Sequence, residues 1–302
     1  MSLQFDARSV TRRARPLAVE FGLVTAALVG LYLWQQLVAI VGPSPGGVLV
    51  GGLVSGGLLL MGVLLFAGAY VAVRDIDPGL AVPTRADRAA VAAAVLTPLV
   101  LVALTKLVGV ATGVPYNALT KTAVAADPPL PPILLLAGLS LVVGVPSLVV
   151  ICQVIVQGSL GRVVDGDAAI VLTTLVTGFV LVGSVGGLAT VPDRGKLAGS
   201  IAFVLLLGVA LFANARVGRD WMRWLAAAPV VAFAALVVLS GVAGVESVAG
   251  GLFAVTQFAT LGVAAYAYDR TDSLLVPALT YATYLLTTRA VVVVFEAGMQ
   301  SW

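Results

Sequence analysis

The side chains that could do chemistry in this chain are few, and most stand alone within long apolar runs. Cys152 is the only cysteine and no histidine occurs, so a metal site made of imidazoles or of several thiolates is excluded. The same composition excludes a Ser–His pair and leaves a Ser–Lys pair, with Lys106 as its base, as the serine-nucleophile arrangement still open. An aspartyl dyad needs two carboxylates at matched depth in the apolar runs, and no such pair occurs.

The charged residues within the apolar runs lie toward the ends of those runs. Glu20 is near the start of the first run, whereas Lys106 and Arg289 lie about 25 Å along their helices at about 1.5 Å per residue, so both cations can reach an interface. A proton- or ion-coupled transporter usually holds a carboxylate or a histidine at the middle of the membrane, and the sequence offers neither there. The neutral polar residues inside the runs include the glutamines Gln153 and Gln257.

The elements that must position these side chains are membrane helices. Hydrophobic residues make up 60% of the chain and charged residues 10%, and the mean hydropathy is +1.10, as in proteins surrounded mostly by lipid. About 20 apolar residues cross a hydrocarbon core of ~30 Å, and continuous runs favour helices over barrel strands. We therefore expect an all-α fold, a polytopic membrane helical bundle that forms one domain over residues 1–302. About nine spans are expected, at 16–41, 47–73, 89–112, 132–158, 168–190, 197–214, 224–242, 248–268 and 273–295.

The basic residues predict the orientation of the bundle. The second side of the predicted topology receives only Lys121, Arg194 and Lys196 in its loops, which is a strong positive-inside bias. We expect a cytoplasmic N-terminus, an external C-terminus and a multi-pass location in the cell membrane. No concentrated basic face occurs, so a nucleic-acid partner is not expected. The N-terminal tail and alternate loops carry Arg8, Arg12, Arg13, Arg15, Arg74, Arg85, Arg88, Arg162, Arg216, Arg219, Arg223 and Arg270.

Three segments carry a more specific pattern. The first is "VPSLVVICQVIVQG" at 145–158, the second is "AAIVLTTLVTGFVL" at 168–181, and the third is "YAYDRTDSLLVPALTYATYLLT" at 266–287. The third places a short polar box before an apolar helix that contains Pro277, Tyr281 and Tyr284. Together these segments resemble the CPBP family of intramembrane metalloproteases, which includes the CAAX prenyl endopeptidases and bacteriocin-processing proteins. The chain would accordingly divide into N-terminal helices at 1–130 and a CPBP-like region at 131–302.

The resemblance rests on framework residues and fails at every position where the family carries a catalytic or metal-binding side chain. Pro146 and the Val156–Gln157–Gly158 run match the family's first motif without a gap. In the third segment the residues that keep the family pattern are Arg270, Thr271, Ser273, Leu274, Pro277 and Ala278. The resemblance implies that the positions of the family's two glutamates, its arginine, its two histidines and its asparagine are occupied here by Leu148, Val149, Gln153, Leu181, Tyr281 and Leu285. It also aligns the phenylalanine of the family's second motif with Thr177.

Metal-assisted peptide hydrolysis needs nitrogen or carboxylate ligands and a base that takes a proton from water. None of the side chains at the aligned positions supplies them, so we expect no catalytic residues, no bound metal and no cofactor, with the family's zinc site lost. Tyr281 is expected to fill the space of a lost histidine. We further predict that Tyr281 and Tyr284 hydrogen-bond Gln153, which would satisfy polar groups in a dry interior and makes these three the candidate binding residues. Asp272 or Ser273 is expected to cap the last helix.

The resemblance implies a degenerate relative without protease activity that binds or scaffolds a membrane partner. Membrane lipid, another membrane protein and a lipid-modified peptide are the expected partners. A permease-like carrier of a small neutral solute, with Gln153, Gln257 and Tyr281 as a polar wall, is a second reading. An active CPBP-type metalloendopeptidase with an unrecognised mechanism is a third. A lateral groove near the cytoplasmic face would favour the first reading, and a water-filled cavity at mid-membrane would favour the carrier.

Overall fold

The computed structural model describes residues 7–41, 48–122, 124–125, 129–183, 186–216 and 220–299. Helices make up most of these residues, and the described part of the chain has two isolated β-bridges in place of a sheet. Between α5 and α7 the chain stays helical through two π-helical segments, Ser140–Gly144 and Val150–Gln157. The α-helices are α1 (Ala7–Val41), α2 (Val48–Arg74), α3 (Arg88–Thr112), α4 (Tyr116–Thr120), α5 (Leu130–Leu139), α6 (Val145–Val149), α7 (Gly158–Leu160), α8 (Gly166–Leu181), α9 (Arg194–Arg216), α10 (Asp220–Ala243), α11 (Val248–Thr271) and α12 (Leu275–Phe295).

Among the described residues, 8 helical segments are long and apolar enough to cross a membrane. The chain is therefore an all-α polytopic membrane bundle, as its composition predicts. The span expected at 168–190 differs from the others, because α8 has 16 residues and ends at Leu181. A glycine-rich segment follows, in which Gly186 has a φ of +77° and lies so close to Thr120 that a Cβ would overlap the backbone there. The helix stops because Val182 is extended and pairs with Leu188, so apolarity alone extended this span too far.

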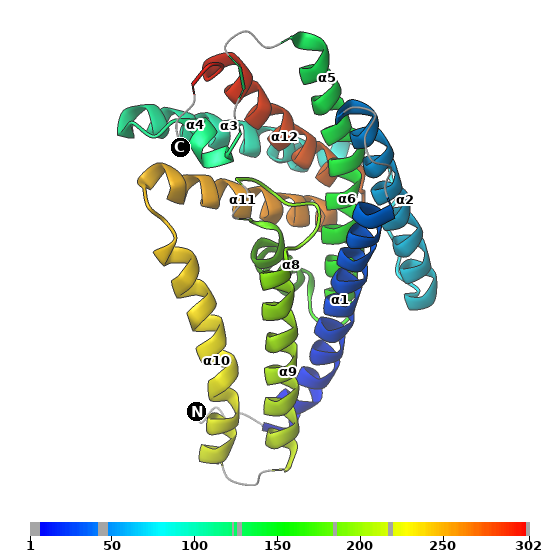
Figure 1. Ribbon diagram of the computed structural model, residues 1–302. Helices are drawn as coiled ribbons and strands as arrows, with labels where there is room; N and C mark the ends of the chain where they lie inside the picture. Colours follow the sequence, from blue (N-terminus) through cyan, green and yellow to red (C-terminus); the bar gives the residue numbers. More distant parts are fainter. Residues whose placement is uncertain are drawn as a thin grey trace.

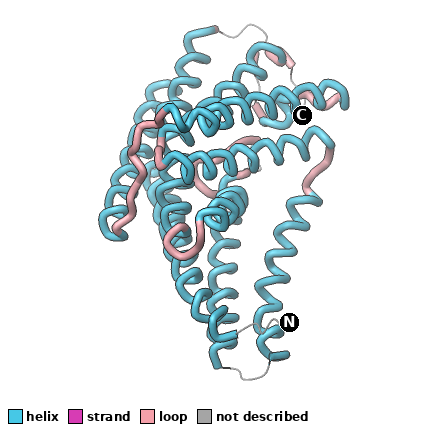
Figure 2. The backbone as a smooth tube through the Cα atoms, turned by 180° about the vertical axis from the view of Figure 1, so that it is seen from behind, coloured by secondary structure: helices cyan, strands magenta, loops and turns pink. Residues whose placement is uncertain are grey.

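Two groups of helices cross one another. Helices α3, α11 and α12 pack side by side, and Figure 1 shows them running across the direction of α1, α9 and α10, which extend below them. The same crossing is visible from behind in Figure 2. Helix α10 packs chiefly against α9, and none of its apolar window is buried within the chain. The helical rod from α5 to α7 joins the groups, because it contacts α2, α8 and α12.

The contacts between helix ends form two sets. In the first, Arg74 pairs with Glu20 and accepts a hydrogen bond from Arg162 through its carbonyl, and Leu80 bridges Ser273. These contacts lie near the loops that fall on the arginine-rich side when successive predicted spans cross the membrane in alternate directions. That this side is cytoplasmic stays a prediction, and Arg219, which was counted toward it, lies outside the described residues.

The second set gathers the opposite ends. The side-chain amide of Asn117 donates to the Met299 carbonyl at 2.5 Å, and the Gly298 N–H donates to the Val124 carbonyl at 2.9 Å. Gly186 also lies against Thr120 on this side. Helix α8 begins near Asp269 on the first side and Gly186, five residues after its end, lies on the second side, so this part of the chain connects the two sides even though the helix is short.

Candidate functional site

The family-like positions meet in one core cluster. Leu148 and Val149 come from α6, Leu181 from the end of α8, and Tyr281 from α12, and all four belong to the same buried cluster. Leu285, one turn after Tyr281, packs against that cluster and is partly buried. The side chains of Leu148, Leu181 and Tyr281 are 0% exposed. Three segments that are far apart in sequence thus converge on a closed, mostly apolar centre.

A hydrogen-bonded polar pair lies in this apolar centre. The Gln153 Nε2 donates to the Tyr281 Oη at 3.1 Å, and the Tyr281 Oη lies 3.4 Å from the Gln153 Oε1, to which it can donate in turn. Both residues are 0% exposed. The thiol of Cys152 lies against the Tyr281 hydroxyl and against Thr177. The predicted Gln153–Tyr281 hydrogen bond is confirmed, and it satisfies two groups that would otherwise be costly to bury.

Tyr284 behaves differently from Tyr281. It belongs to a second buried cluster with Tyr116 and Phe253, and its Oη has no hydrogen-bond partner among the described residues. The predicted hydrogen bond between Tyr284 and Gln153 is therefore wrong. Residues 281 and 284 are three apart on α12, so the two side chains leave the helix about 60° apart, and they enter different clusters.

The backbone of the Gln153 segment is unusual. Residues Val150–Gln157 are π-helical, and all eight of them are buried. Pro146, close to the start of α6, lacks an N–H and cannot donate to the preceding turn. The Gln157 Nε2 donates to the Ala265 carbonyl of α11 at 2.9 Å, which ties the π-helical segment to that helix. π-Helical turns inside α-helices occur frequently at functional sites.

The polar box before α12 holds two helices and a loop together. Asp272 has a φ of +47° and ends α11, and its carbonyl accepts from the Ala81 N–H at 3.3 Å. The Ser273 Oγ accepts from the Leu275 N–H at 3.3 Å, so of the two expected caps it is Ser273 that contacts the first turn of α12. The Leu274 N–H donates to the Gly79 carbonyl at 2.9 Å. The box therefore has a structural role in fixing where α12 begins.

A buried ion pair that sequence reasoning did not find fastens the opposite end of α12. Glu296 is 0% exposed, and its carboxylate pairs with the Lys106 ammonium of α3. The same carboxylate accepts from the backbone N–H of Tyr116 at 2.7 Å and from that of Asn117. Burial, with a smaller effect from the Glu296 carboxylate, raises the pKa of Tyr116 to about 12, so its hydroxyl stays neutral at physiological pH. We name this group, Lys106, Tyr116, Asn117 and Glu296, the C-terminal clasp.

The clasp could have been anticipated in part. The sequence placed Lys106 near the outer interface and Glu296 at the end of the last span, which put opposite charges on one side of the membrane. Both are also isolated in apolar surroundings, where an unpaired charge is costly. The clasp leaves Lys106 engaged by a carboxylate, and this pairing removes it from the role of a free base in a Ser–Lys arrangement.

The chemical capacity of the motif cluster is small. Its polar members are the amide of Gln153, the phenol of Tyr281, the thiol of Cys152 and the hydroxyl of Thr177, none of which carries a charge when buried. Across the described residues, no group of three or more histidine, cysteine, aspartate or glutamate side chains is placed to hold a metal ion. The cluster can hydrogen-bond a neutral group, but only if helices α6, α8 and α12 separate to admit it.

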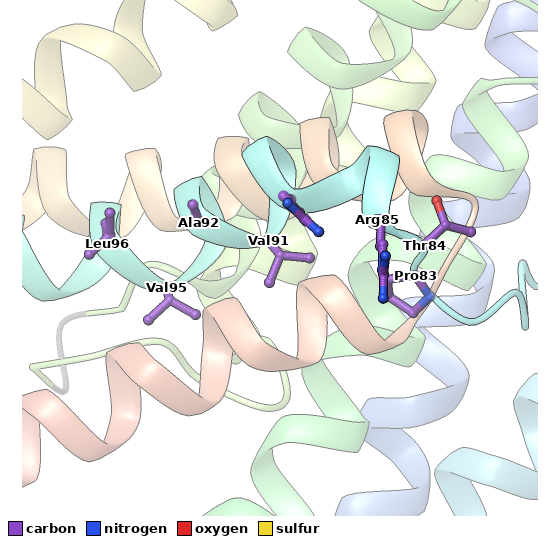
Figure 3. Close-up of a pocket in the computed structure, with 8 residues that line it drawn as sticks. Pro83, Thr84, Arg85, Val91, Ala92, Val95 and Leu96 are labelled. Atoms are coloured by element: carbon purple, nitrogen blue, oxygen red, sulfur yellow. The ribbon is translucent and has the colours of Figure 1, made fainter.

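Two hollows lie on the surface of the bundle, away from this cluster. One, of about 650 Å³, follows the first turns of α3 and is drawn in Figure 3. The other, of about 510 Å³, lies between α1 and α2 beside Trp34 and Phe66. Neither is lined by Gln153, Tyr281 or Tyr284, the three candidate binding residues.

Comparison with protein-family models, with curated proteins and with solved structures gives no match. The resemblance to the CPBP family accordingly rests on the quoted residues alone and stays a prediction.

Proposed function

We propose that this chain is a proteolytically inactive CPBP-like membrane protein that binds or scaffolds a hydrophobic membrane partner, such as another membrane protein or a lipid-modified peptide. The observation that carries the proposal is the meeting of Leu148, Gln153, Leu181 and Tyr281, from three separate helices, in one cluster. An intramembrane hydrolase would place its ligands and its base at such a convergence. A chance likeness of three apolar segments has no reason to bring the aligned positions together.

The side chains at this convergence support the loss of hydrolysis. Leucine cannot ligate zinc or take a proton from water, and it stands at the aligned glutamate position 148 and the aligned histidine position 181. Of the four polar groups there, those of Gln153 and Tyr281 hydrogen-bond each other, and the Cys152 thiol lies against Tyr281 and Thr177. A site whose polar groups are paired internally and whose apolar groups are packed has a structural role, and the surface of the bundle is left for binding.

The position of the two hollows favours a binding role over that of a carrier. Both open on the outside of the helices, one along α3 and one between α1 and α2. A permease-like carrier would use Gln153, Gln257 and Tyr281 as the wall of a solute path. Gln257 is 2% exposed and its Oε1 has no hydrogen-bond partner among the described residues, which is the one feature that speaks for the carrier.

The proposal is tested with the purified full-length protein in lipid nanodiscs. A fluorescent farnesylated peptide is titrated by anisotropy, beside the same peptide without the lipid, and cleavage is followed by mass spectrometry in the presence and absence of zinc. Saturable binding that requires the farnesyl group, without cleavage, is expected. Zinc-dependent cleavage would overturn the inactive assignment, and equal binding of both peptides would overturn the preference for a lipid-modified partner.

The register of the motifs is tested separately. The triple variant Leu148→Glu, Leu181→His, Tyr281→His restores ligand types at the aligned positions, and its zinc content is measured by elemental mass spectrometry after dialysis. The control moves the histidine of α12 to Ala282, one position along. Zinc retained by the restored variant and not by the control is expected, whereas equal zinc in both, or zinc in the unaltered protein, would contradict the register.

The carrier has a test of its own. Uptake of a labelled neutral solute into proteoliposomes would support the carrier in place of the binding role.

A further inference from the structure

The hollow along α3 combines unpaired positive charge with an apolar floor. Its polar end consists of Thr84, Arg85 and Arg88, and its apolar part consists of Val91, Ala92, Val95 and Leu96, with Pro83 at the rim. Figure 3 shows Thr84 and Arg85 at one end and Ala92, Val95 and Leu96 farther along the helix. We propose that this hollow binds one anionic phospholipid, with its phosphate at the two arginines and an acyl chain along the apolar strip.

The charges at the polar end are available to a ligand. Arg85 and Arg88 are both exposed, and within the described residues neither forms an ion pair or a hydrogen bond. Asp87, the acidic residue between them, is turned back onto Thr84, whose N–H and Oγ donate to its carboxylate at 2.6 Å and 2.8 Å. The carboxylate is therefore engaged in the capping box of the short 3-10 turn Arg85–Asp87 that precedes α3, and it leaves the two exposed guanidinium groups without a partner. Guanidinium is the side chain best suited to phosphate oxygens.

The apolar strip has the length and direction that an acyl chain requires. Positions 88, 91, 92, 95 and 96 follow the spacing of one helix face. At about 1.5 Å per residue, Leu96 lies about 12 Å from Arg88 along α3, close to the depth of one hydrocarbon leaflet, which is about half of ~30 Å. Leu96 is 55% exposed, so this face of α3 is not covered by the rest of the chain. A headgroup at the arginines would place its chain along the strip without a turn.

The occupant follows from the combination of features. A free phosphate would use the arginines and leave the strip unused, and a neutral lipid would use the strip and leave the arginines unpaired. An anionic phospholipid uses both, and the arginines lie on the side of the bundle where basic loops gather, where such lipids are attracted. The inference goes beyond the proposed peptide-binding role, because its evidence is the pair of arginines and the apolar strip of α3 and not the motif cluster.

The experiment measures lipid retention by native mass spectrometry of the full-length protein. The protein is released from mixed micelles of phosphatidylcholine and phosphatidylglycerol, and its affinity for phosphatidylglycerol is also titrated. Retention of one phosphatidylglycerol in preference to phosphatidylcholine is expected. Arg85→Gln and Arg88→Gln should each weaken that affinity about five-fold. Ala92→Phe, which fills the strip from an exposed position, should weaken it as well.

The matched control is Arg270→Gln, which removes an exposed charge stacked on Tyr266 on the same side of the bundle. Its affinity for phosphatidylglycerol should stay within a factor of two of the unaltered protein. An equal loss in this control would mean diffuse surface attraction and would overturn the proposal. Two other results would assign the hollow to another ligand and overturn the proposal. One is that inorganic phosphate binds as tightly as the lipid, and the other is that a farnesylated peptide displaces the lipid through Arg85.

Discussion

Removing the carboxylate of the C-terminal clasp should cost the protein a large share of its stability. The substitution Glu296→Leu leaves the Lys106 ammonium unpaired and two backbone N–H groups, those of Tyr116 and Asn117, without an acceptor. A buried donor left unsatisfied costs about 1–3 kcal/mol, and breaking a buried ion pair by removing one partner costs about 3–5 kcal/mol. The Lys106 side chain is 19% exposed, so its ammonium can partly reach water and the ion-pair contribution belongs at the lower end of its range, about 3 kcal/mol, before the cost of the two N–H groups is added.

The assay is thermal or denaturant unfolding of the detergent-solubilised protein, together with hydrogen exchange at residues 116 and 117. The double variant Lys106→Met, Glu296→Leu should lose less than the sum of its single variants, because no charge remains unpaired. The control, Glu246→Gln, changes an exposed carboxylate at the start of α11 and should stay within about 0.5 kcal/mol. If Glu296→Leu is no less stable than this control, or if exchange at 116 and 117 is unchanged, the clasp does not hold the C-terminus and the reasoning fails.

Two further predictions concern the buried centre and the packing of α8. Tyr281→Phe should destabilise the protein by about 1–3 kcal/mol, because it leaves the amide of Gln153 without its partner, and adding Gln153→Leu should restore part of the loss in the same unfolding assay. Gly178→Ala should cost about 1–3 kcal/mol, because a Cβ there would overlap the ring of Phe258 on α11, whereas Gly208→Ala on α9, with open space around it, should be neutral or slightly stabilising. A loss at position 208 equal to that at position 178 would show that the penalty reflects glycine replacement in general.

The parts of the fold that follow from local apolarity could be predicted from the sequence. Runs of about 20 apolar residues identify the long helices, because lipid offers no alternative partner for the backbone. The end of α8 could not be predicted in this way, since Leu181 and the residues after it are equally apolar. The helix ends because Val182 is extended and pairs back with Leu188 in an isolated β-bridge, and that contact exists only in the folded chain.

The candidate site, like the fold, could be predicted from the sequence only in part. The pairing of Gln153 with Tyr281 was predictable, because a polar group in a dry interior needs a partner and the aligned segments placed the two residues at similar depth. The failure for Tyr284 has a simple cause, since a residue three positions away on the same helix faces another neighbour. The clasp was missed because Lys106 and Glu296 are separated by 190 residues, and Lys106 was interpreted alone as a cation that can reach an interface.

The Gln153–Tyr281 pair and the apolar residues around it constrain one another. If carboxylates stood at positions 148 and 149, Gln153 could bond them and Tyr281 would face unpaired charge in a dry cluster. With leucine and valine there, Gln153 has few alternatives to the Tyr281 hydroxyl, and the two groups satisfy each other at 3.1 Å. Replacing one member of such a set without the others leaves a buried polar group unpaired, at about 1–3 kcal/mol. Single substitutions that bring a charge into this cluster are therefore expected to destabilise the packing of α6, α8 and α12.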